Sequence, residues 1–173
     1  MADLKTFETL GGLSVDTTTV VDFERNLLNV NSLEVKNSNF DNARTTNYVL
    51  TGTDTIILSL DTVARSIDLR QNSLNFINTY VAAVNATGAG LLTLKLESAV
   101  TCDGSGDVVE LSTMTTTIKD SVPSGEEWSI VPYTAGATYK FSYAATKNGV
   151  GPLVRWFAYV QIVSVDWTWV LNR

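Results

Sequence analysis

Hydrophobic and polar residues alternate through most of the chain beyond residue 47, and this alternation predicts β-strands. Leu92, Leu94 and Leu96 are separated by single polar residues, and every second residue from 139 to 143 is aromatic. Successive side chains of a strand point to opposite faces, so each of these segments presents one apolar face to a core. Further strands are predicted at residues 55–60, 66–70, 74–84, 108–111, 113–118, 128–131, 153–165 and 167–171.

The predicted strands are short, and segments rich in Gly, Asp or Pro separate them. No helical periodicity is interleaved with them, so a parallel α/β sheet is not expected. This pattern is typical of an antiparallel sandwich, jelly-roll or barrel. We therefore predict an all-β fold in which residues 48–173 form an antiparallel, jelly-roll-like β-sandwich.

The first 47 residues follow a different pattern, in which isolated apolar side chains stand among many Thr and Asn residues. Residues 16–19 and 37–39 favour turns over helix, and only short extended pieces are indicated near residues 28–35. We predict that residues 1–47 are an extended arm that forms no core of its own and is ordered by a neighbouring chain. The candidate anchor points are Phe7, Leu10, Leu13, Phe23 and Phe40.

The composition narrows the classes of function. The formal net charge of −6 disfavours a nucleic-acid-binding domain, which needs a basic face. The chain has no His, which removes the commonest general base and imidazole metal ligand, and its single Cys can form no internal disulfide. There is no basic region leading into an apolar run, and no apolar stretch approaches the roughly 20 residues that cross a bilayer. We expect a soluble protein without a signal peptide, cofactor, metal site or catalytic residue.

Three loop motifs have both a functional and a structural interpretation. The acidic segment 103–107 (DGSGD) could offer two carboxylates to a hard cation, but it lacks further ligands, and a solvent-facing turn is favoured. The glycine pairs in 88–90 and 149–151 could suggest phosphate loops, but no Lys-Ser/Thr or helix follows them, so both are interpreted as turns. Cys102 has no His to pair with and is expected to be a small buried thiol.

The acidic pair Glu126 and Glu127 precedes Trp128, which suggests a carboxylate beside a sugar platform. Adjacent strand residues point to opposite faces, so the two carboxylates cannot act across one substrate, and a solvated strand entry is favoured. Trp156 is expected in the core. Trp167 and Trp169 share one face of the last predicted strand, and core and subunit interface remain equally open for them.

The extended Thr/Asn-rich arm of residues 1–47, followed by an acidic, His-free β-domain with strands around 91–96 and 138–143, resembles the virion structural proteins of tailed bacteriophages. Within that group the chain is most similar to capsid decoration (cement) proteins. This resemblance implies symmetric oligomers, commonly trimers, that sit on the capsid lattice with arms laid over coat subunits. It carries over no functional residue.

The leading hypothesis is a non-enzymatic structural protein that binds and stabilises a phage capsid. Its expected partners are the major capsid protein and further copies of itself, with a trimer favoured and neither nucleic acid nor membrane involved. It would be made in the host cytoplasm and located on the capsid surface of the virion. The alternative hypothesis is a carbohydrate- or receptor-binding module of a phage tail or neck component, with Trp128, Trp167 or Trp169 as the sugar platforms. The interface candidates are Phe7, Leu10, Leu13, Phe23, Phe40, Trp167 and Trp169.

Overall fold

The computed structural model describes residues 13–15, 18–21, 32–37, 40–61, 65–134 and 138–167. The chain divides into two compact units, residues 1–31 and residues 32–173. In the first unit, β1 (Leu13–Val15) pairs antiparallel with β2 (Thr18–Val21) through a register that contains one bulge. The described residues contain no helix, and therefore none long and apolar enough to cross a membrane.

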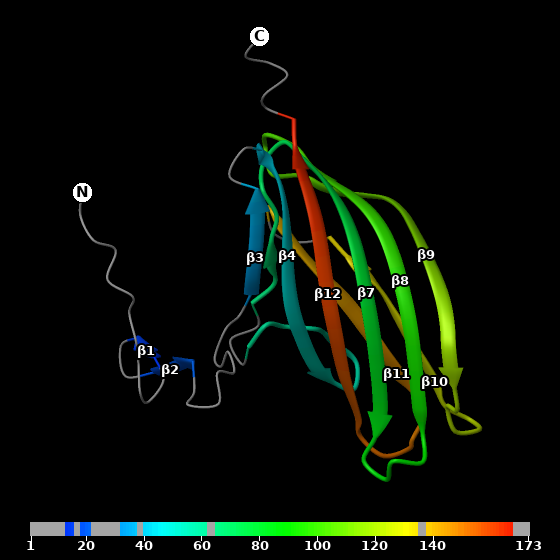
Figure 1. Ribbon diagram of the computed structural model, residues 1–173. Helices are drawn as coiled ribbons and strands as arrows, with labels where there is room; N and C mark the ends of the chain where they lie inside the picture. Colours follow the sequence, from blue (N-terminus) through cyan, green and yellow to red (C-terminus); the bar gives the residue numbers. More distant parts are fainter. Residues whose placement is uncertain are drawn as a thin grey trace. The chain divides into compact units, whose positions relative to one another are not determined.

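The second unit is built on a sheet of six antiparallel strands in the order β3-β4-β12-β7-β8-β9 (Figure 1). The strand β12 lies near the middle and pairs along most of its length with β4 on one side and β7 on the other. The alternation of apolar and polar residues is clearest in β8, where Leu92, Leu94 and Leu96 are separated by single polar residues. The bounds of the strands are Ser32–Asn37 for β3, Phe40–Thr53 for β4, Ser73–Asn85 for β7, Leu91–Cys102 for β8, Val108–Asp120 for β9 and Val154–Asp166 for β12.

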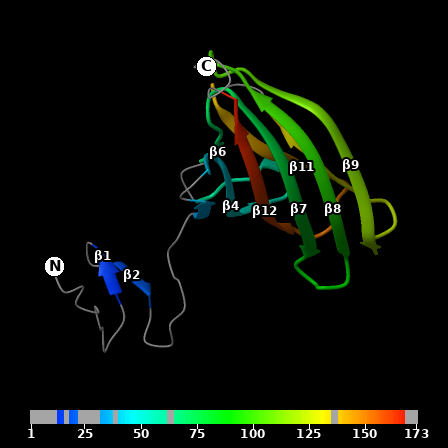
Figure 2. The same ribbon diagram turned by 45° about the horizontal axis from the view of Figure 1, so that its top comes forward.

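A smaller antiparallel sheet lies behind the first and crosses its strands at an angle (Figures 1 and 2). Its main members are β10 (Glu127–Tyr133) and β11 (Lys140–Asn148), which form a hairpin. Two short strands, β5 (Ile56–Ile57) and β6 (Ile67–Asp68), pair with the other side of β11. The prediction of an all-β, antiparallel fold is confirmed, and the two sheets form a β-sandwich.

The core fills the space between the two sheets and is made by the alternate residues that face inward. On the large sheet, β7 and β12 alternate buried and more exposed positions along almost their whole length. The small sheet contributes Trp128, Ile130, Phe141 and Tyr143, all buried. The phenyl ring of Phe141 and the phenol ring of Tyr143 meet edge to face, with centroids 5.2 Å apart. This arrangement is a favourable geometry for an aromatic pair.

Some predicted elements differ from the observed ones. The segment 55–60 yields only the two-residue β5, with exposed side chains, while Leu58 just after it is buried. The two short strands predicted at 108–111 and 113–118 are one strand, β9, because bulges in its pairing with β8 accommodate the interruption. The last predicted strand at 167–171 is not seen in its described part, since β12 ends at Asp166 and Trp167 follows it.

The expected division between residues 47 and 48 falls inside β4. That strand pairs continuously with β12 from Ala43, which is opposite Val165, to Thr53, which is opposite Arg155. Residues 32–37 add β3 to the same sheet. The structure therefore places the start of the compact sandwich unit at Ser32.

Candidate functional site: an aromatic face and an adjoining pocket

Aromatic side chains stand on the outer face of the six-stranded sheet, away from the core. Phe157 and Tyr159 on β12 are 45% and 38% exposed, and Phe76 and Tyr80 on β7 are 48% and 51% exposed. Tyr159 lies directly opposite Tyr80 in the β12–β7 register. Cross-strand partners share one face of a sheet, so these rings form one surface, which we call the aromatic face. It consists of Phe76, Tyr80, Phe157 and Tyr159.

Polar side chains form a row across the strands next to the Tyr159–Tyr80 pair. Gln161 is opposite Asn47 on β4 and Asn78 on β7. The Tyr159 hydroxyl donates a hydrogen bond of 2.8 Å to Oδ1 of Asn47, which also accepts one of 3.4 Å from Nε2 of Gln161. The amide groups of this row are therefore held beside the rings and offer both donors and acceptors to a ligand.

An ion pair lies on the other side of Tyr80. Lys95 on β8 is opposite Tyr80, and its Nζ is 2.9 Å from Oε1 of Glu97. The hydrogen bond that Lys95 donates to Glu97 raises the pKa of Lys95 above its ordinary value. The two opposite charges largely cancel each other at this position.

Exposed aliphatic side chains widen the apolar surface toward β3 and β4. Leu33 and Val35 on β3 and Val49 on β4 are all exposed, and Val49 is directly opposite Tyr159. An apolar surface of this extent is more than isolated exposed residues, which are normal on any protein. It indicates a surface that a partner or ligand covers.

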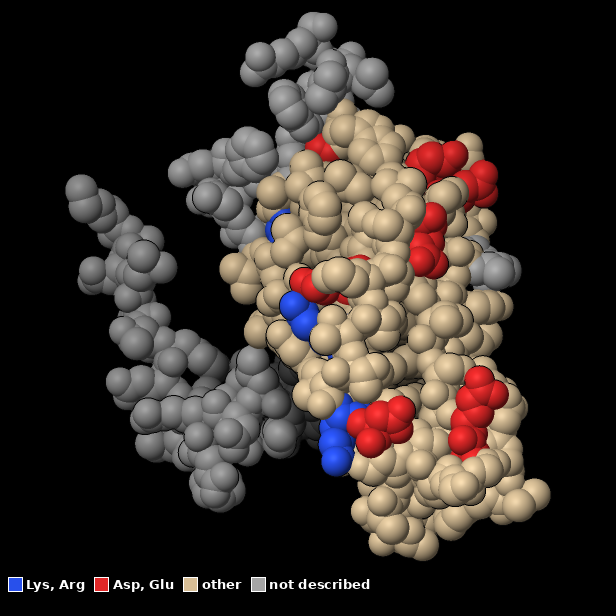
Figure 3. Space-filling model, turned by 90° about the vertical axis from the view of Figure 1, so that its right-hand side faces the viewer, with Lys and Arg blue, Asp and Glu red and all other residues tan. Residues whose placement is uncertain are grey.

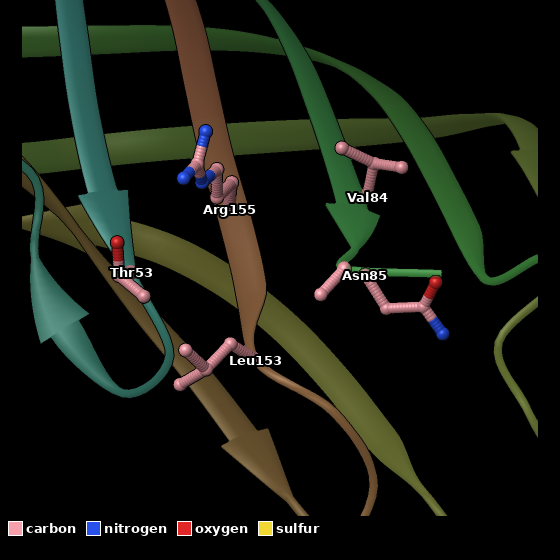
Figure 4. Close-up of a pocket in the computed structure, with 6 residues that line it drawn as sticks. Thr53, Val84, Asn85, Leu153 and Arg155 are labelled. Atoms are coloured by element: carbon pink, nitrogen blue, oxygen red, sulfur yellow. The ribbon is translucent and has the colours of Figure 1, made fainter. Parts of the chain in front are cut away.

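A pocket lies at the end of the sheet where β12 begins and β7 ends (Figure 4). Its volume is about 510 Å³, within the range typical of small-molecule sites. Figure 4 shows Arg155 between Thr53 of β4 and Val84 of β7, with Leu153 beside it. The pocket is lined by Thr53, Val84, Asn85, Ala86, Leu153 and Arg155.

The backbone around this pocket is fixed by hydrogen bonds. The amide of Ala86 donates to the carbonyl of Leu153 at 2.9 Å, which ties the β7–β8 loop to the start of β12. The amide of Val154 donates to Oδ1 of Asp54 at 2.9 Å, and the amide of Asp54 donates to the Val154 carbonyl at 2.8 Å. The β7–β8 loop, the turn after β4 and the start of β12 are therefore joined by hydrogen bonds, which hold the pocket in a defined shape.

The surface charge is mainly negative, in agreement with the composition. Seen from the β9 edge, acidic side chains outnumber basic ones (Figure 3). Residues 111–118 of β9 carry no charged side chain at all. Because the protein as a whole is acidic, Arg155 in the pocket is a local positive charge on a mainly negative surface.

The structure places the tryptophans differently from the predicted sugar platforms. Trp128 is buried, and its Nε1 donates a hydrogen bond of 2.8 Å to Oε2 of Glu126, so it is no exposed platform. Trp156 lies in the core as expected, with its Nε1 donating to the Asp54 carbonyl at 2.9 Å. Trp167 is partly buried, and its backbone amide donates to the Asn72 carbonyl at 2.9 Å.

The other interface candidates are tested little or not at all by the structure. Phe7, Leu10, Phe23 and Trp169 lie outside the described residues. Leu13 begins β1 and Phe40 begins β4, and for these two only the backbone is described. The interface role of these residues stays a prediction.

The loop motifs behave as turns. Oδ1 of Asp103 accepts hydrogen bonds from the amides of Ser105 and Asp107, at 2.8 and 2.9 Å, so this carboxylate caps its own loop. Gly88 and Gly149 have positive φ angles of 74° and 109° in the two connections first considered as phosphate loops. Cys102 is fully buried, and burial raises the pKa of its thiol. In the described part of the chain, no group of three or more His, Cys, Asp or Glu residues could hold a metal ion.

The sequence carries a signal for the aromatic face within β12. In residues 156–160, large side chains fall on both faces of the strand, Trp156 on one face and Phe157 and Tyr159 on the other, so one face must carry large side chains that the core does not use. The register with β7 then brings Tyr80 to Tyr159, and no sequence pattern shows that pairing.

Comparisons with known proteins include a structural likeness. No family model matches the chain, and no curated protein matches it. Among solved structures, the chain is similar to the tailspike protein gp49 from Acinetobacter baumannii bacteriophage Fri1, described as a capsular polysaccharide depolymerase. The TM-score is 0.45 at 16% sequence identity, over 83% of this chain and 21% of that protein.

This comparison corrects one expectation. The matched protein is an enzyme by its description, which contradicts the expectation that the chain is not an enzyme, and we withdraw that expectation. The chain spans about a fifth of the matched protein, and the depolymerase activity belongs to the description of the whole tailspike protein.

Proposed function

We propose that the chain is a carbohydrate-binding module whose site is the aromatic face of the six-stranded sheet. The observation that carries the proposal is the arrangement of four exposed rings on two neighbouring strands, with a row of amide side chains beside them. The tryptophans that the sequence suggested as platforms are replaced in this proposal by Tyr80, Tyr159, Phe157 and Phe76.

The chemistry of a sugar chain suits this surface. One side of a pyranose ring carries several C–H groups and packs on an aromatic ring, while its hydroxyls need hydrogen-bond donors and acceptors at the ring edge. The rings of Tyr80 and Tyr159 supply the first, and Asn47, Asn78 and Gln161 supply the second. Aromatic side chains have few rotatable bonds, so they offer a large contact area at a low entropy cost.

The surface is also long enough for an extended ligand. Four residues of strand separate Arg155 from Tyr159, which corresponds to about 13 Å at the usual rise of a β-strand. The row of Gln161 lies two residues further along β12. An open face of this kind accepts a linear chain that continues at both ends.

The resemblance of the sequence to virion proteins of tailed phages supports a place for this module on a phage particle. A carbohydrate-binding module would serve there in the tail or neck, where a virion meets the glycans of a cell surface. The matched tailspike protein also belongs to a phage.

The test is binding to an array of bacterial surface polysaccharides by the whole chain. We expect selective retention of one or a few glycans by the wild type, and a loss of about tenfold or more in affinity for the double variant Tyr80→Ala/Tyr159→Ala. The matched control is Val131→Ala, which removes an equally exposed apolar group from β10 on the opposite sheet and leaves binding unchanged. Equal binding by the double variant and the wild type would refute the proposed site.

A second candidate function is attachment to a capsid as a decoration protein. The exposed aliphatic side chains Leu33, Val35 and Val49 favour it, because stacking of sugars does not need them while a protein partner would cover them. In this case the chain co-purifies with capsids at near-lattice stoichiometry and raises the temperature of genome release. Removal of residues 1–31, the separate N-terminal unit, would weaken that effect more than it weakens the fold.

A further inference from the structure

The pocket at the start of β12 is continuous with the aromatic face. Arg155 and Phe157 are two residues apart on one strand, so their side chains project from the same face. Arg155 is opposite Thr53 on β4 and Val84 on β7, and Phe157 is in the next row, opposite Thr51 and Ala82. A chain lying on the aromatic face therefore reaches the pocket at its end.

Arg155 is exposed and has no carboxylate partner among the described residues. By contrast, Lys95 on the same outer face pairs with Glu97, and elsewhere on the sheet Arg44 pairs with Glu34. An arginine that points into a shaped pocket with its charge unneutralised offers a planar set of donors that fits a carboxylate. Thr53, directly opposite Arg155 on β4, also lines the pocket, and its hydroxyl adds a further donor or acceptor.

We infer that the ligand of this site is an acidic polysaccharide, and that Arg155 binds the carboxylate of a uronic or sialic acid unit in the pocket. The inference rests on the proposed carbohydrate-binding function and specifies its ligand class. Thr53 contacts the same unit, while Leu153 and Val84 pack against the apolar side of its ring. The adjoining units lie along Phe157, Tyr159 and Tyr80.

Because the protein is acidic, its specificity for an acidic sugar depends on Arg155. A net charge of −6 repels an anionic polymer over much of the surface, so the affinity must come from a local contact. A hydrogen bond to a charged group contributes about 1.5–3 kcal/mol, which corresponds to a loss of about 10- to 100-fold in affinity when Arg155 is replaced by a neutral residue.

The experiment uses the whole chain on an array of neutral and uronate- or sialate-bearing bacterial polysaccharides. The best-bound polymer is then compared with its carboxyl-reduced form, which keeps the backbone and loses the charge. We expect retention of acidic polymers, a loss of about 10- to 100-fold for Arg155→Gln on the acidic form, and little change on the reduced form. Arg155→Lys, which keeps the charge without the planar fork, recovers part of the loss.

Two controls separate the possible failures. Arg70→Gln makes the same charge change near the other end of β7 and leaves binding unchanged. If the wild type prefers neutral polymers, or Arg155→Gln binds the acidic polymer as well as the wild type does, the inference is refuted. In that case a loss of binding in Tyr80→Ala/Tyr159→Ala still supports the proposed function. If the wild type retains no glycan, both are refuted.

Discussion

The buried phenol of Tyr143 gives a sharp test of how the two sheets are joined. Tyr143 is fully buried on β11, and its hydroxyl oxygen lies 2.6 Å from Oγ1 of Thr79 on β7, which is also fully buried. This hydrogen bond connects the small sheet to the large one through the core. Tyr143→Phe removes the hydroxyl and leaves Thr79 without that partner, so we expect a loss of about 1–3 kcal/mol in the free energy of unfolding at pH 7.

We also expect the difference in stability between the wild type and Tyr143→Phe to change with pH, because Tyr143 can ionise at high pH. Burial raises the pKa of Tyr143 to about 12, whereas an exposed tyrosine titrates near 10. Because the folded-state pKa is the higher one, the stability is fully present below pH 10 and is lost as the pH rises from 10 to 12. Two pKa units correspond to about 3 kcal/mol of stability, which the wild type loses as the pH rises. Tyr143→Phe has no hydroxyl to ionise at this position and does not show this loss. The variant is therefore less stable than the wild type at pH 7 and about equal to it, or more stable, near pH 12.

The measurement is urea unfolding, followed by tryptophan fluorescence, at pH 7, 9, 10 and 11. The other tyrosines are the same in both proteins, so the difference between wild type and variant isolates Tyr143. The control Tyr80→Phe removes an exposed hydroxyl from the outer face, stays within about 0.5 kcal/mol of the wild type at pH 7 and keeps the alkaline loss. A difference between wild type and Tyr143→Phe that is constant from pH 7 to pH 11 would refute the reasoning.

Two further predictions concern the packing. Trp156→Ala removes a buried indole that donates to the Asp54 carbonyl and should cost about 3–5 kcal/mol in chemical denaturation. Its neighbour Phe157 is 45% exposed, so Phe157→Ala should cost only about 1 kcal/mol. Similar losses for both would show that the outer face is packed as fully as the core. Gly106→Ala should cost about 2–4 kcal/mol, because φ is +89° and the added Cβ would overlap Thr138 and Tyr139. Gly88→Ala should cost about 1 kcal/mol in the same assay, because φ is +74° but the space around the added Cβ is open. Equal costs for the two glycines would contradict the close approach at Gly106.

The alternation of residues was enough to predict the strands and the sides that face the core. Leu92, Leu94 and Leu96 are all buried, as their spacing indicates, and Tyr143 lies inward with Phe141. These features depend only on the two-residue period of a strand, which the sequence carries directly. The all-β class followed from the same period.

The partner of each strand could not be predicted in this way, because pairing joins residues that are far apart in the chain. Residues 32–47 have few apolar side chains and therefore suggested an arm, yet Ala43 lies opposite Val165 in β4–β12. A central strand such as β12 can pair with a polar strand through backbone hydrogen bonds alone. Such pairing requires no hydrophobic pattern in the sequence of the polar strand. The site was missed for a related reason, since Tyr80 and Tyr159 meet only through the β7–β12 register.

The two faces of β12 show how one strand can serve both the fold and the site. Trp156, Ala158 and Val160 face the core, while Phe157 and Tyr159 face outward, so each face has its own set of large side chains. The four rings of the aromatic face keep about half of their surface in water, roughly 400 Å² together, which corresponds to about 10 kcal/mol of burial that folding leaves unused. A ligand that covers them gains part of this, after the cost of its own ordering. Substitutions on the inner face of β12 should therefore lower stability strongly, and substitutions on the outer face should lower binding with a much smaller change in stability. A protein in which Phe157→Ala lowers stability as much as Trp156→Ala does would not have this division between its faces.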